Sequence, residues 1–423
     1  MTLPLPAELE IVPLSSPVHA EVVIPGSKSI TNRALVAAAL ADGVTTVTGA
    51  LWSDDTQVMV DCLRRLDFDV SVEDDPEEPA NRTIGVTGRG GRLAAGGTAS
   101  RPLDLFVGNA GTAARFLAAM VALGHGAYRL YGVPRMHERP QASLFAALRQ
   151  LGYRVDDSDG RLPAVIHGTG PRPGHCDVSV DESSQFASAL LLSARRGSWD
   201  IRVTGGDAEE LPYVTMTRNL VEAFPAAGGA FAIEPDASSA SYFVGAGHLL
   251  AAGGSRVSVK GFPASGWQID ADLPRYLPLP AELSRDKHLG DAIMTAIVLA
   301  PFADHPVRFT DLGRLRVQEC ERVFALRSGL ERMGARVEEE GDTLTISPSS
   351  LHGAEIETYD DHRVAMCFAM LGLVVEGVRV KDPGCVAKTF PNFFAKLAAP
   401  PPSGLGATLL DGLGRELRAA DLG

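Results

Sequence analysis

The stretch GRLRVQECER, residues 313–322, carries five charged side chains in a chain otherwise rich in alanine, leucine and valine. Carboxylates can transfer protons, and guanidinium groups bind phosphate or carboxylate in a forked geometry. Glu319 and Arg322 stand at i and i+3, so they share one side of a helix start. A solvated helix face has the same pattern, and the stretch alone leaves both interpretations open.

A second group of chemically useful residues lies in PGSKSITNRAL, residues 25–35. Lys28, Ser29 and Arg33 combine a point charge, a hydroxyl and a planar fork, which suits a phosphate or a carboxylate. The segment is not a nucleotide-binding phosphate loop, because that motif requires glycine where this chain has Glu21.

Three further segments could bind a ligand. GNAGTAAR, residues 108–115, has glycines that allow close backbone approach before a helix begins. GVPRMHERP, residues 132–140, contains Arg135, although a surface loop with local ion pairs explains it equally well. SSQF, residues 183–186, supplies two hydroxyls and an amide, or simply caps a helix.

Two acidic positions have competing interpretations. Asp291 stands directly before the apolar run IMTAIVLA, so it is either an N-cap or a general base whose pKa is set by burial and neighbours. DDHR, residues 360–363, has one histidine and two adjacent acids without ligand-like spacing elsewhere, and we expect no metal there.

The elements that must position these residues form an internal repeat. A polar turn, an Ala/Leu-rich helix and an alternating strand recur six times, at residues 25–49, 108–132, 182–206, 236–261, 290–313 and 360–384. Amphipathic helices are expected between the copies at 56–68, 141–153 and 321–335. The repeat helices are apolar nearly all round and should be interior. If their N-termini converge, the exposed N–H groups would attract an anion, although the polar residues there could also be plain caps.

Composition limits the class of protein. A chain of 423 residues with 45% hydrophobic and 22% charged residues predicts a soluble protein of two domains. The net charge of -13 argues against binding to nucleic acid or an anionic membrane. Five scattered cysteines, with no signal peptide or membrane-spanning segment, predict a cytoplasmic location. Residues 401–423 begin PPSG and are expected to form a loosely held tail.

Nine segments, in order between about residues 5 and 398, resemble the 5-enolpyruvylshikimate-3-phosphate synthases: PGSKSITNRAL, GNAGTAARFL, PRMHERP, SSQF, DASSASYF, GDAIMTA, RVQECERV, YDDHRVAM and DPGCVAKTFPNFF. The resemblance implies an α/β fold of two similar domains. Each would contain three βαβαββ units around buried parallel helices, the inside-out barrel of enolpyruvyl transferases. The first domain would comprise residues 1–22 and 236–400, the second residues 23–235, followed by the 401–423 tail.

The resemblance further implies transfer of the enolpyruvyl group of phosphoenolpyruvate to the 5-hydroxyl of shikimate 3-phosphate, with release of phosphate, on the route to chorismate. No metal or organic cofactor is expected, and we expect a monomer. Asp291 would take the acceptor proton, Glu319 would assist protonation of the methylene carbon, and Lys28 would aid phosphate departure. The acceptor would be held by Lys28, Ser29, Arg33, Ser183, Ser184, Gln185, Asp291 and Gln318. Phosphoenolpyruvate would be held by Lys28, Gly111, Arg135, Gln185, Arg322, Arg363 and Lys388.

Three positions depart from the family pattern, and in the family all three surround the phosphate of the acceptor. Gln318 stands where lysine is usual, Arg314 where asparagine is usual, and Glu210 where serine is usual. The changes remove one cation and add one anion, which Arg314 could offset as a forked donor one turn before Gln318. Alternatively, Arg314 pairs with Glu210 and the acceptor lacks that phosphate. A noncatalytic binding protein of the same fold is a further alternative, against which the presence of both Asp291 and Glu319 argues.

Overall fold

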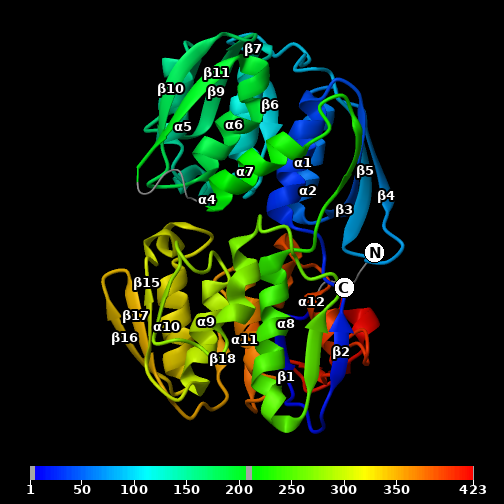
Figure 1. Ribbon diagram of the computed structural model, residues 1–423, viewed down its shortest axis with the longest axis vertical. Coiled ribbons are helices and arrows are strands. Elements are labelled where there is room, and N and C mark those ends of the chain that lie inside the picture. The colour runs from blue at the N-terminus through cyan, green and yellow to red at the C-terminus, as the bar shows by residue number, and fades with distance from the viewer. Residues whose placement is uncertain (1–4, 206–211, 423) are drawn as a thin grey trace. The chain divides into compact units, whose positions relative to one another are not determined.

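The computed structural model describes residues 5–205 and 212–422. The chain forms two compact units (Figure 1). Unit 1 comprises Met1–Pro25 and Pro235–Gly423, and unit 2 comprises Gly26–Glu234. None of the helices in the described ranges has the length and apolarity needed to cross a lipid bilayer.

Unit 2 has a core of helices packed against one another. Its helices are α1 (Lys28–Leu40), α2 (Asp54–Arg65), α3 (Gly111–Ala122), α4 (Pro134–Glu138), α5 (Ala142–Gln150), α6 (Gln185–Gly197) and α7 (Pro212–Ala223). Helices α1, α3 and α6 contact each other, and every residue of α3 is buried. Alanine and leucine dominate these helices, so their backbones can pack closely on all sides.

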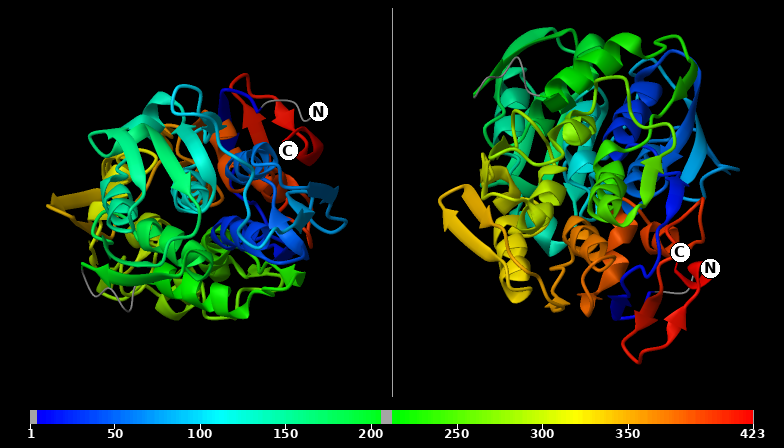
Figure 2. Two further views of the ribbon diagram at one scale, coloured as in Figure 1. Left: turned by 90° about the horizontal axis from the view of Figure 1, so that it is seen from above. Right: turned by 60° about the horizontal axis from the view of Figure 1, so that its bottom comes forward.

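Three sheets flank the helices among the described residues of unit 2 (Figure 2). The first sheet has the strand order β12 (Gly229–Ala232), β3 (Val44–Leu51), β5 (Asn81–Thr87), β4 (Val70–Asp74). The second has the order β6 (Leu103–Phe106), β7 (His125–Tyr131), β9 (Arg161–Thr169), β8 (Arg154–Ser158). The third is the pair β10 (Gly174–Ser179) and β11 (Trp199–Thr204). Strands β6 and β7 run parallel with α3 between them, and β10 and β11 run parallel with α6 between them. Both are the crossover that a parallel pair requires.

Unit 1 repeats this design. Its helices are α8 (Ala237–Leu250), α9 (Ile293–Leu299), α10 (Arg322–Arg332), α11 (His362–Leu371) and α12 (Phe393–Ala398), with 3-10 helices η1 (Ala251–Gly253), η2 (Ile269–Tyr276), η3 (Ala300–Phe302), η4 (Gly313–Val317), η5 (Pro383–Lys388) and η6 (Ala419–Asp421). Helices α8, α9 and α11 contact one another, and every residue of α9 and α11 is buried.

The sheets of unit 1 also contain parallel pairs. One sheet has the strand order β18 (Glu355–Ile356), β19 (Val378–Lys381), β1 (Glu8–Ile11), β20 (Leu409–Asp411), β21 (Glu416–Leu417). Another is the pair β13 (Arg256–Val259) and β2 (His19–Val22). A further sheet has the order β14 (Glu282–Ser284), β15 (Val307–Thr310), β17 (Thr343–Ser347), β16 (Arg336–Glu340). Helix α9 connects the parallel strands β14 and β15, and α11 connects β18 and β19.

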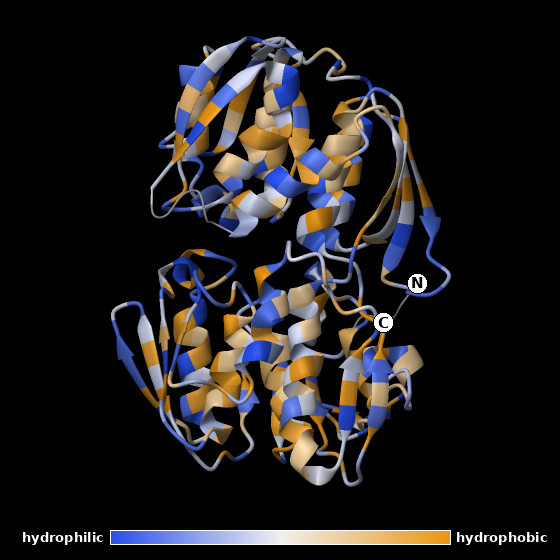
Figure 3. Ribbon diagram, in the orientation of Figure 1, coloured by the Kyte–Doolittle hydropathy of each residue, from blue (hydrophilic) through white to orange (hydrophobic). Residues whose placement is uncertain are grey.

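The six-copy repeat predicted from the sequence is confirmed at the level of helix followed by strand. The six helices are α1, α3, α6, α8, α9 and α11, and the strands that follow them are β3, β7, β11, β13, β15 and β19. Figure 3 shows the helices carrying broad hydrophobic segments, while several strands alternate between hydrophobic and hydrophilic residues. The amphipathic segments predicted between the copies form α2, α5 and α10.

The prediction of a loosely held tail is wrong for residues 401–422. Strand β20 pairs with β1, with Ile11 opposite Leu409, and Leu405, Leu409 and Leu422 are buried in the core of unit 1. The Glu21 N–H also donates to the Pro402 carbonyl at 2.9 Å. The apolar residues are separated by turns, and their partners lie near the other end of the chain, so no local pattern reveals them.

Candidate functional site

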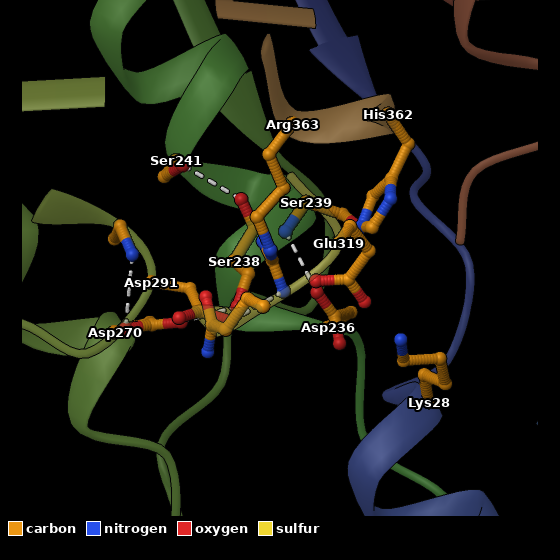
Figure 4. A network of polar contacts seen from close by, with 12 residues as sticks. Lys28, Asp236, Ser238, Ser239, Ser241, Asp270, Asp291, Glu319, His362 and Arg363 are labelled. Atoms are coloured by element: carbon orange, nitrogen blue, oxygen red, sulfur yellow. Dashed lines mark hydrogen bonds and ion pairs between the residues drawn. The ribbon is translucent and has the colours of Figure 1, made fainter. Parts of the chain in front are cut away.

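Asp291 lies in the turn before α9, and its carboxylate lies close to three arginines, of which Figure 4 shows Arg363. Its Oδ1 is 3.2 Å from Nη2 of Arg285, and its Oδ2 is 3.1 Å from Nη2 of Arg363. Nη1 of Arg322 lies 3.9 Å from Oδ1. Burial opposes ionisation of this carboxyl, but the charges of Arg363, Arg322 and Arg285 outweigh it and hold its pKa below the usual range. Asp291 is therefore ionised, and the neighbouring arginines stabilise its negative charge.

Arg322 is the centre of the same network. Its side chain is 1% exposed, and its Nε donates to Oδ2 of Asp361 at 2.7 Å. Its Nη2 lies 2.9 Å from Oε2 of Glu319, and its Nη1 donates to Oε1 of Gln318. Burial disfavours the charged guanidinium, but the carboxylates of Asp361, Glu319 and Asp291 raise its pKa well above the usual value. Glu319 and Arg322, which the i, i+3 spacing placed on one side of a helix start, form an ion pair, although Glu319 precedes the helix rather than lying in it.

Lys388 joins the network from η5. Its Nζ is 3.3 Å from Oε1 of Glu319, and both side chains are nearly buried. Arg363 lies at the start of α11 and is also buried. Burial disfavours its charge, but Asp291 and other nearby acids raise its pKa well above normal. Unit 1 thus places two carboxylates, Asp291 and Glu319, among four cationic side chains.

Helix capping explains some of the acidic residues but not Asp291. Asp236 accepts a hydrogen bond from Ser239 N–H at 2.7 Å and caps α8, and Asp361 accepts one from Arg363 N–H at 2.9 Å and caps α11. The N-cap residue of α9 is Ala292, which makes no side-chain cap. The carboxylate of Asp291 is directed to arginines instead, so the N-cap interpretation does not describe it.

Lys28, Ser29 and Arg33 lie in the first two turns of α1 in unit 2. Lys28 forms an ion pair with Asp55 at 3.2 Å. Arg33 is 2% exposed and donates to Oγ1 of Thr217 at 2.7 Å, to the Ser29 carbonyl at 2.9 Å, and to two further neutral oxygens, those of the Ser188 hydroxyl and the Tyr213 carbonyl. Burial lowers its pKa to about 10, and Tyr213 partly offsets the shift. Among the described residues, these bonds use four of its five N–H groups.

Gly111 and Gln185 lie near the buried Arg115. Nη1 of Arg115 donates to Oε1 of Gln185 at 3.0 Å, and the Gln185 N–H donates to the Ser183 hydroxyl oxygen at 3.3 Å. A methyl group on Gly111 would lie 2.5 Å from Nη1 of Arg115. Ser184 precedes α6, and its hydroxyl makes no capping bond. Glycine therefore leaves room for guanidinium groups at the start of α3.

Arg135 is a partly exposed residue of α4 in unit 2. Its side chain is 40% exposed and pairs with Glu138 at 2.6 Å in α4. This geometry matches the surface ion pair that the sequence left open. Of the three departures from the family pattern, Gln318 binds Arg322, Arg314 lies in η4, and Glu210 lies outside the described residues.

Sequence reasoning missed several members of the network in unit 1. Arg285 lies in an irregular stretch after β14, and Asp270 lies in η2, where neither follows a helix or strand pattern. Asp361 was seen as part of DDHR, but its role as the buried partner of Arg322 joins segments 39 residues apart. No group of three His, Cys, Asp or Glu side chains suited to a metal ion occurs within residues 5–205 and 212–422.

Comparison with known proteins gives concordant matches. Residues 12–227 and 285–397 match the family model of EPSP synthase (3-phosphoshikimate 1-carboxyvinyltransferase). A protein of Nostoc punctiforme named 3-phosphoshikimate 1-carboxyvinyltransferase is 38% identical over 429 residues, covering 92% of this chain and 98% of that protein. A Rhizobium etli protein of the same name is 40% identical over 437 residues, covering 96% of this chain and 99% of that protein.

Two solved structures share the fold. An EPSP synthase of Acinetobacter baumannii has a TM-score of 0.72 at 21% identity and covers 95% of this chain and 99% of that chain. The enolpyruvyl transferase NikO of Streptomyces tendae has a TM-score of 0.66 at 15% identity and covers 96% of this chain and 99% of that chain. The chain shares a mixed α/β fold with both.

Proposed function

The chain belongs to the EPSP synthase family, and from this membership we propose that it transfers the enolpyruvyl group of phosphoenolpyruvate to the 5-hydroxyl of shikimate 3-phosphate, releasing inorganic phosphate. The observation that carries the proposal is the position of Arg322. This buried guanidinium binds Glu319 at 2.9 Å and lies 3.9 Å from Asp291, so one cationic group supports two carboxylates that could act as acid and base.

The reaction would proceed by addition and then elimination. In the addition, the acceptor oxygen bonds to C2 of phosphoenolpyruvate, its proton passes to Asp291, and Glu319 delivers a proton to the methylene carbon, which becomes a methyl group. In the elimination, the C2–O bond to phosphate breaks with the assistance of Lys28, and the methyl group returns a proton to Glu319. The proton held by Asp291 passes to the departing phosphate, so both carboxylates are regenerated. The product is an enol ether, and protons and charge balance over the two steps.

Phosphoenolpyruvate carries a phosphate and a carboxylate close together, and a dense set of cations would offset their mutual repulsion. We assign its binding to Arg322, Arg363 and Lys388 in unit 1, and to Lys28, Gly111, Arg135 and Gln185 in unit 2. We assign the acceptor to Ser29, Arg33, Ser183, Ser184, Gln185 and Gln318, together with Lys28 and Asp291.

Binding of phosphoenolpyruvate would also adjust the base. In the structure, Arg363 and Arg322 hold the pKa of Asp291 low, which makes it a weak proton acceptor. An anion bound to those two guanidinium groups opposes their charge and raises the proton affinity of Asp291. The base would thus become effective when the donor substrate is present.

The finer architecture follows the family. We propose that each unit is a domain of three βαβαββ units around buried parallel helices, with one domain at residues 1–25 plus 235–423 and the other at 26–234. The parallel pairs bridged by α3, α6, α9 and α11 support this assignment. We further propose that the protein is a cytoplasmic monomer and that it works without a metal or an organic cofactor.

Two other functions are less well supported. One alternative is enolpyruvyl transfer to an acceptor that lacks the phosphate, which the departures at Arg314, Gln318 and Glu210 suggest. The other is a noncatalytic binding protein of the same fold. Relatives that match nearly the whole chain carry the name 3-phosphoshikimate 1-carboxyvinyltransferase, which favours neither alternative.

Complementation of an aromatic amino acid auxotroph that lacks this activity tests the proposal. The wild-type chain should restore growth, and Asp291→Asn should not. Asp304→Asn is the matched control, because Asp304 is 95% exposed in the same unit and should leave growth intact. Absence of growth with soluble wild-type protein would contradict the proposal. Phosphate release from phosphoenolpyruvate with another alcohol would then indicate a different acceptor, and binding without release would indicate a noncatalytic protein.

A further inference from the structure

Asp270 is a buried acid that belongs to none of the motifs resembling the family. It lies in η2, next to the start of that 3-10 helix, and is 4% exposed. A buried carboxyl needs specific partners, because removing its charge from water is costly. Its partners therefore indicate what the residue does.

The two oxygens of Asp270 connect two different helix starts. Oδ1 accepts a hydrogen bond from the Ala292 N–H at 3.1 Å, and Oδ2 accepts one from the hydroxyl of Ser238 in the first turn of α8. Ala292 directly follows Asp291, the proposed base. Figure 4 shows Asp270, Ser238 and Asp291 gathered together, with the bond to the backbone nitrogen drawn.

The Ala292 N–H has particular need of this bond. Ala292 is 1% exposed and is the N-cap residue of α9, a helix that has no side-chain cap of its own. A buried N–H at a helix start requires an acceptor from elsewhere. Asp270 supplies that acceptor and so holds the peptide that joins Asp291 to Ala292.

A neighbouring residue serves α8 in the same way. Oε1 of Gln268 accepts from the Ala237 N–H at 2.9 Å, and its Nε2 donates to the Pro235 carbonyl at 2.8 Å. Residues 268–270 therefore organise the starts of two of the three buried helices of unit 1, and only Asp270 does so with a charge.

The charge of Asp270 acts on the network around the base. Asp270 faces Ser238 of α8, Asp291 and the Ala292 N–H before α9, and the guanidinium of Arg363 of α11. Burial raises the pKa of Asp270 to about 6, with Asp291 contributing to the rise and Arg363 opposing it. At neutral pH the ionised Asp270 offsets part of the positive charge of the guanidinium groups around Asp291. This raises the proton affinity of Asp291 and favours proton transfer to it.

We propose that Asp270 is a positioning residue for the transferase reaction, fixing the Asp291–Ala292 peptide and supplying negative charge beside the base. This inference rests on the proposed function of Asp291. Asp270 itself need not touch either substrate.

Asp270→Asn tests the charge. The amide retains an oxygen for the Ala292 N–H but stays neutral at every pH, so it should behave like the wild-type enzyme with Asp270 protonated. We expect the ratio of wild-type to variant kcat/KM to rise from near 1 at pH 5 to about tenfold at pH 7.5, as one unit of base pKa would give. Forming the ratio cancels the titration of the substrate phosphates, whose pKa is near 6. A ratio that is constant with pH would overturn the electrostatic role.

Asp270→Ala tests the positioning, with Asp272→Asn as the matched control. Asp272 lies in the same 3-10 helix, its side chain is 38% exposed, and it pairs with Arg275 three residues away. The alanine variant should lower kcat at least tenfold with the KM for phosphoenolpyruvate unchanged, whereas the control should match wild type. A raised KM with unchanged kcat would instead make Asp270 a substrate ligand and contradict the proposal.

Hydrogen exchange separates this inference from the function on which it rests. The Ala292 amide should exchange at least tenfold faster in Asp270→Ala than in wild type or Asp272→Asn, and this readout needs no substrate. Wild-type protein inactive toward shikimate 3-phosphate would refute the proposed function alone. Unchanged exchange at Ala292 would refute the positioning role alone. If the alanine variant fails to fold, the pH ratio of the asparagine variant still decides the matter.

Discussion

Arg322 and Arg363 of unit 1 and Arg33 of unit 2 are all buried, but they have opposite surroundings. In unit 1, Arg322 and Arg363 bind carboxylates, and those charges raise their pKa values although burial opposes it. In unit 2, Arg33 is equally buried but its hydrogen bonds go to hydroxyl and carbonyl oxygens, and burial lowers its pKa to about 10. Its guanidinium also lies over the ring of Phe116, 5.2 Å from the centroid.

This contrast suggests a division of labour. An anion that reaches Arg322 or Arg363 competes with carboxylates, and each carboxylate that loses its cation becomes a better proton acceptor. An anion near Arg33 changes no carboxylate in the same way. Unit 1 is thus suited to proton transfer coupled to anion binding, and unit 2 is suited to orienting hydroxyl groups.

The largest effect should come from removing the base. Asp291→Asn should lower kcat by about 10²- to 10⁴-fold, the usual contribution of general acid–base catalysis. Steady-state kinetics with both substrates measures it, alongside the exposed control Asp304→Asn. A loss of less than tenfold would remove Asp291 from the mechanism as the base.

The next effect compares the two arginines directly. Arg322→Met leaves Asp361 buried without its partner and should destabilise unit 1 by about 3–5 kcal/mol. Arg33→Met leaves only neutral groups unpaired and should cost unit 2 about 1–3 kcal/mol. Hydrogen exchange in each unit, followed as denaturant is added, measures both free energies of unfolding. Equal losses would show that the charge of the partners does not distinguish the two sites.

The pH dependence of stability gives a third test. The pKa of Asp291 is lower in the folded than in the unfolded state, so the unfolded chain binds more protons and stability rises with pH through this range. Its contribution is complete above about pH 4, near the usual aspartate pKa, and is lost as the pH falls further. The difference in unfolding free energy between wild type and Asp291→Asn should therefore shrink between pH 6 and pH 3. A difference that grew on acidification would contradict the depressed pKa.

The smallest effect concerns unit 2. A methyl group at Gly111 would lie 2.5 Å from Nη1 of Arg115 and 2.8 Å from Cζ of Arg139, so both flexible ends must move. Gly111→Ala should raise the KM for phosphoenolpyruvate by about tenfold, equivalent to ~1.4 kcal/mol, with the KM of the acceptor unchanged. Gly253→Ala, whose methyl would meet nothing within 4 Å, is the control. An equal change in both KM values would mean that Gly111 serves the backbone rather than the donor substrate.

Local patterns in the sequence predicted a large part of this structure. The apolar helices α3, α9 and α11 carry their own signal of burial. The spacing of Glu319 and Arg322 placed both on one side of a helix start. The two side chains do form an ion pair, but Glu319 lies before the helix.

The remaining features depend on contacts between distant segments. Lys388 meets Glu319 across 69 residues, Asp270 meets Ala292 across an irregular stretch, and β20 pairs with β1 from the far end of the chain. Neither helix nor strand periodicity marks Asp270 or Arg285, because Asp270 lies in a short 3-10 helix and Arg285 in a turn after β14.

The most direct test of the account is to follow purified protein with phosphoenolpyruvate and shikimate 3-phosphate by phosphorus NMR. Inorganic phosphate and the 5-enolpyruvyl ether of shikimate 3-phosphate should appear in equal amounts, and Asp291→Asn should slow the formation of both together. Persistence of both substrates with well-folded wild-type protein, or phosphate release without the ether, would contradict it.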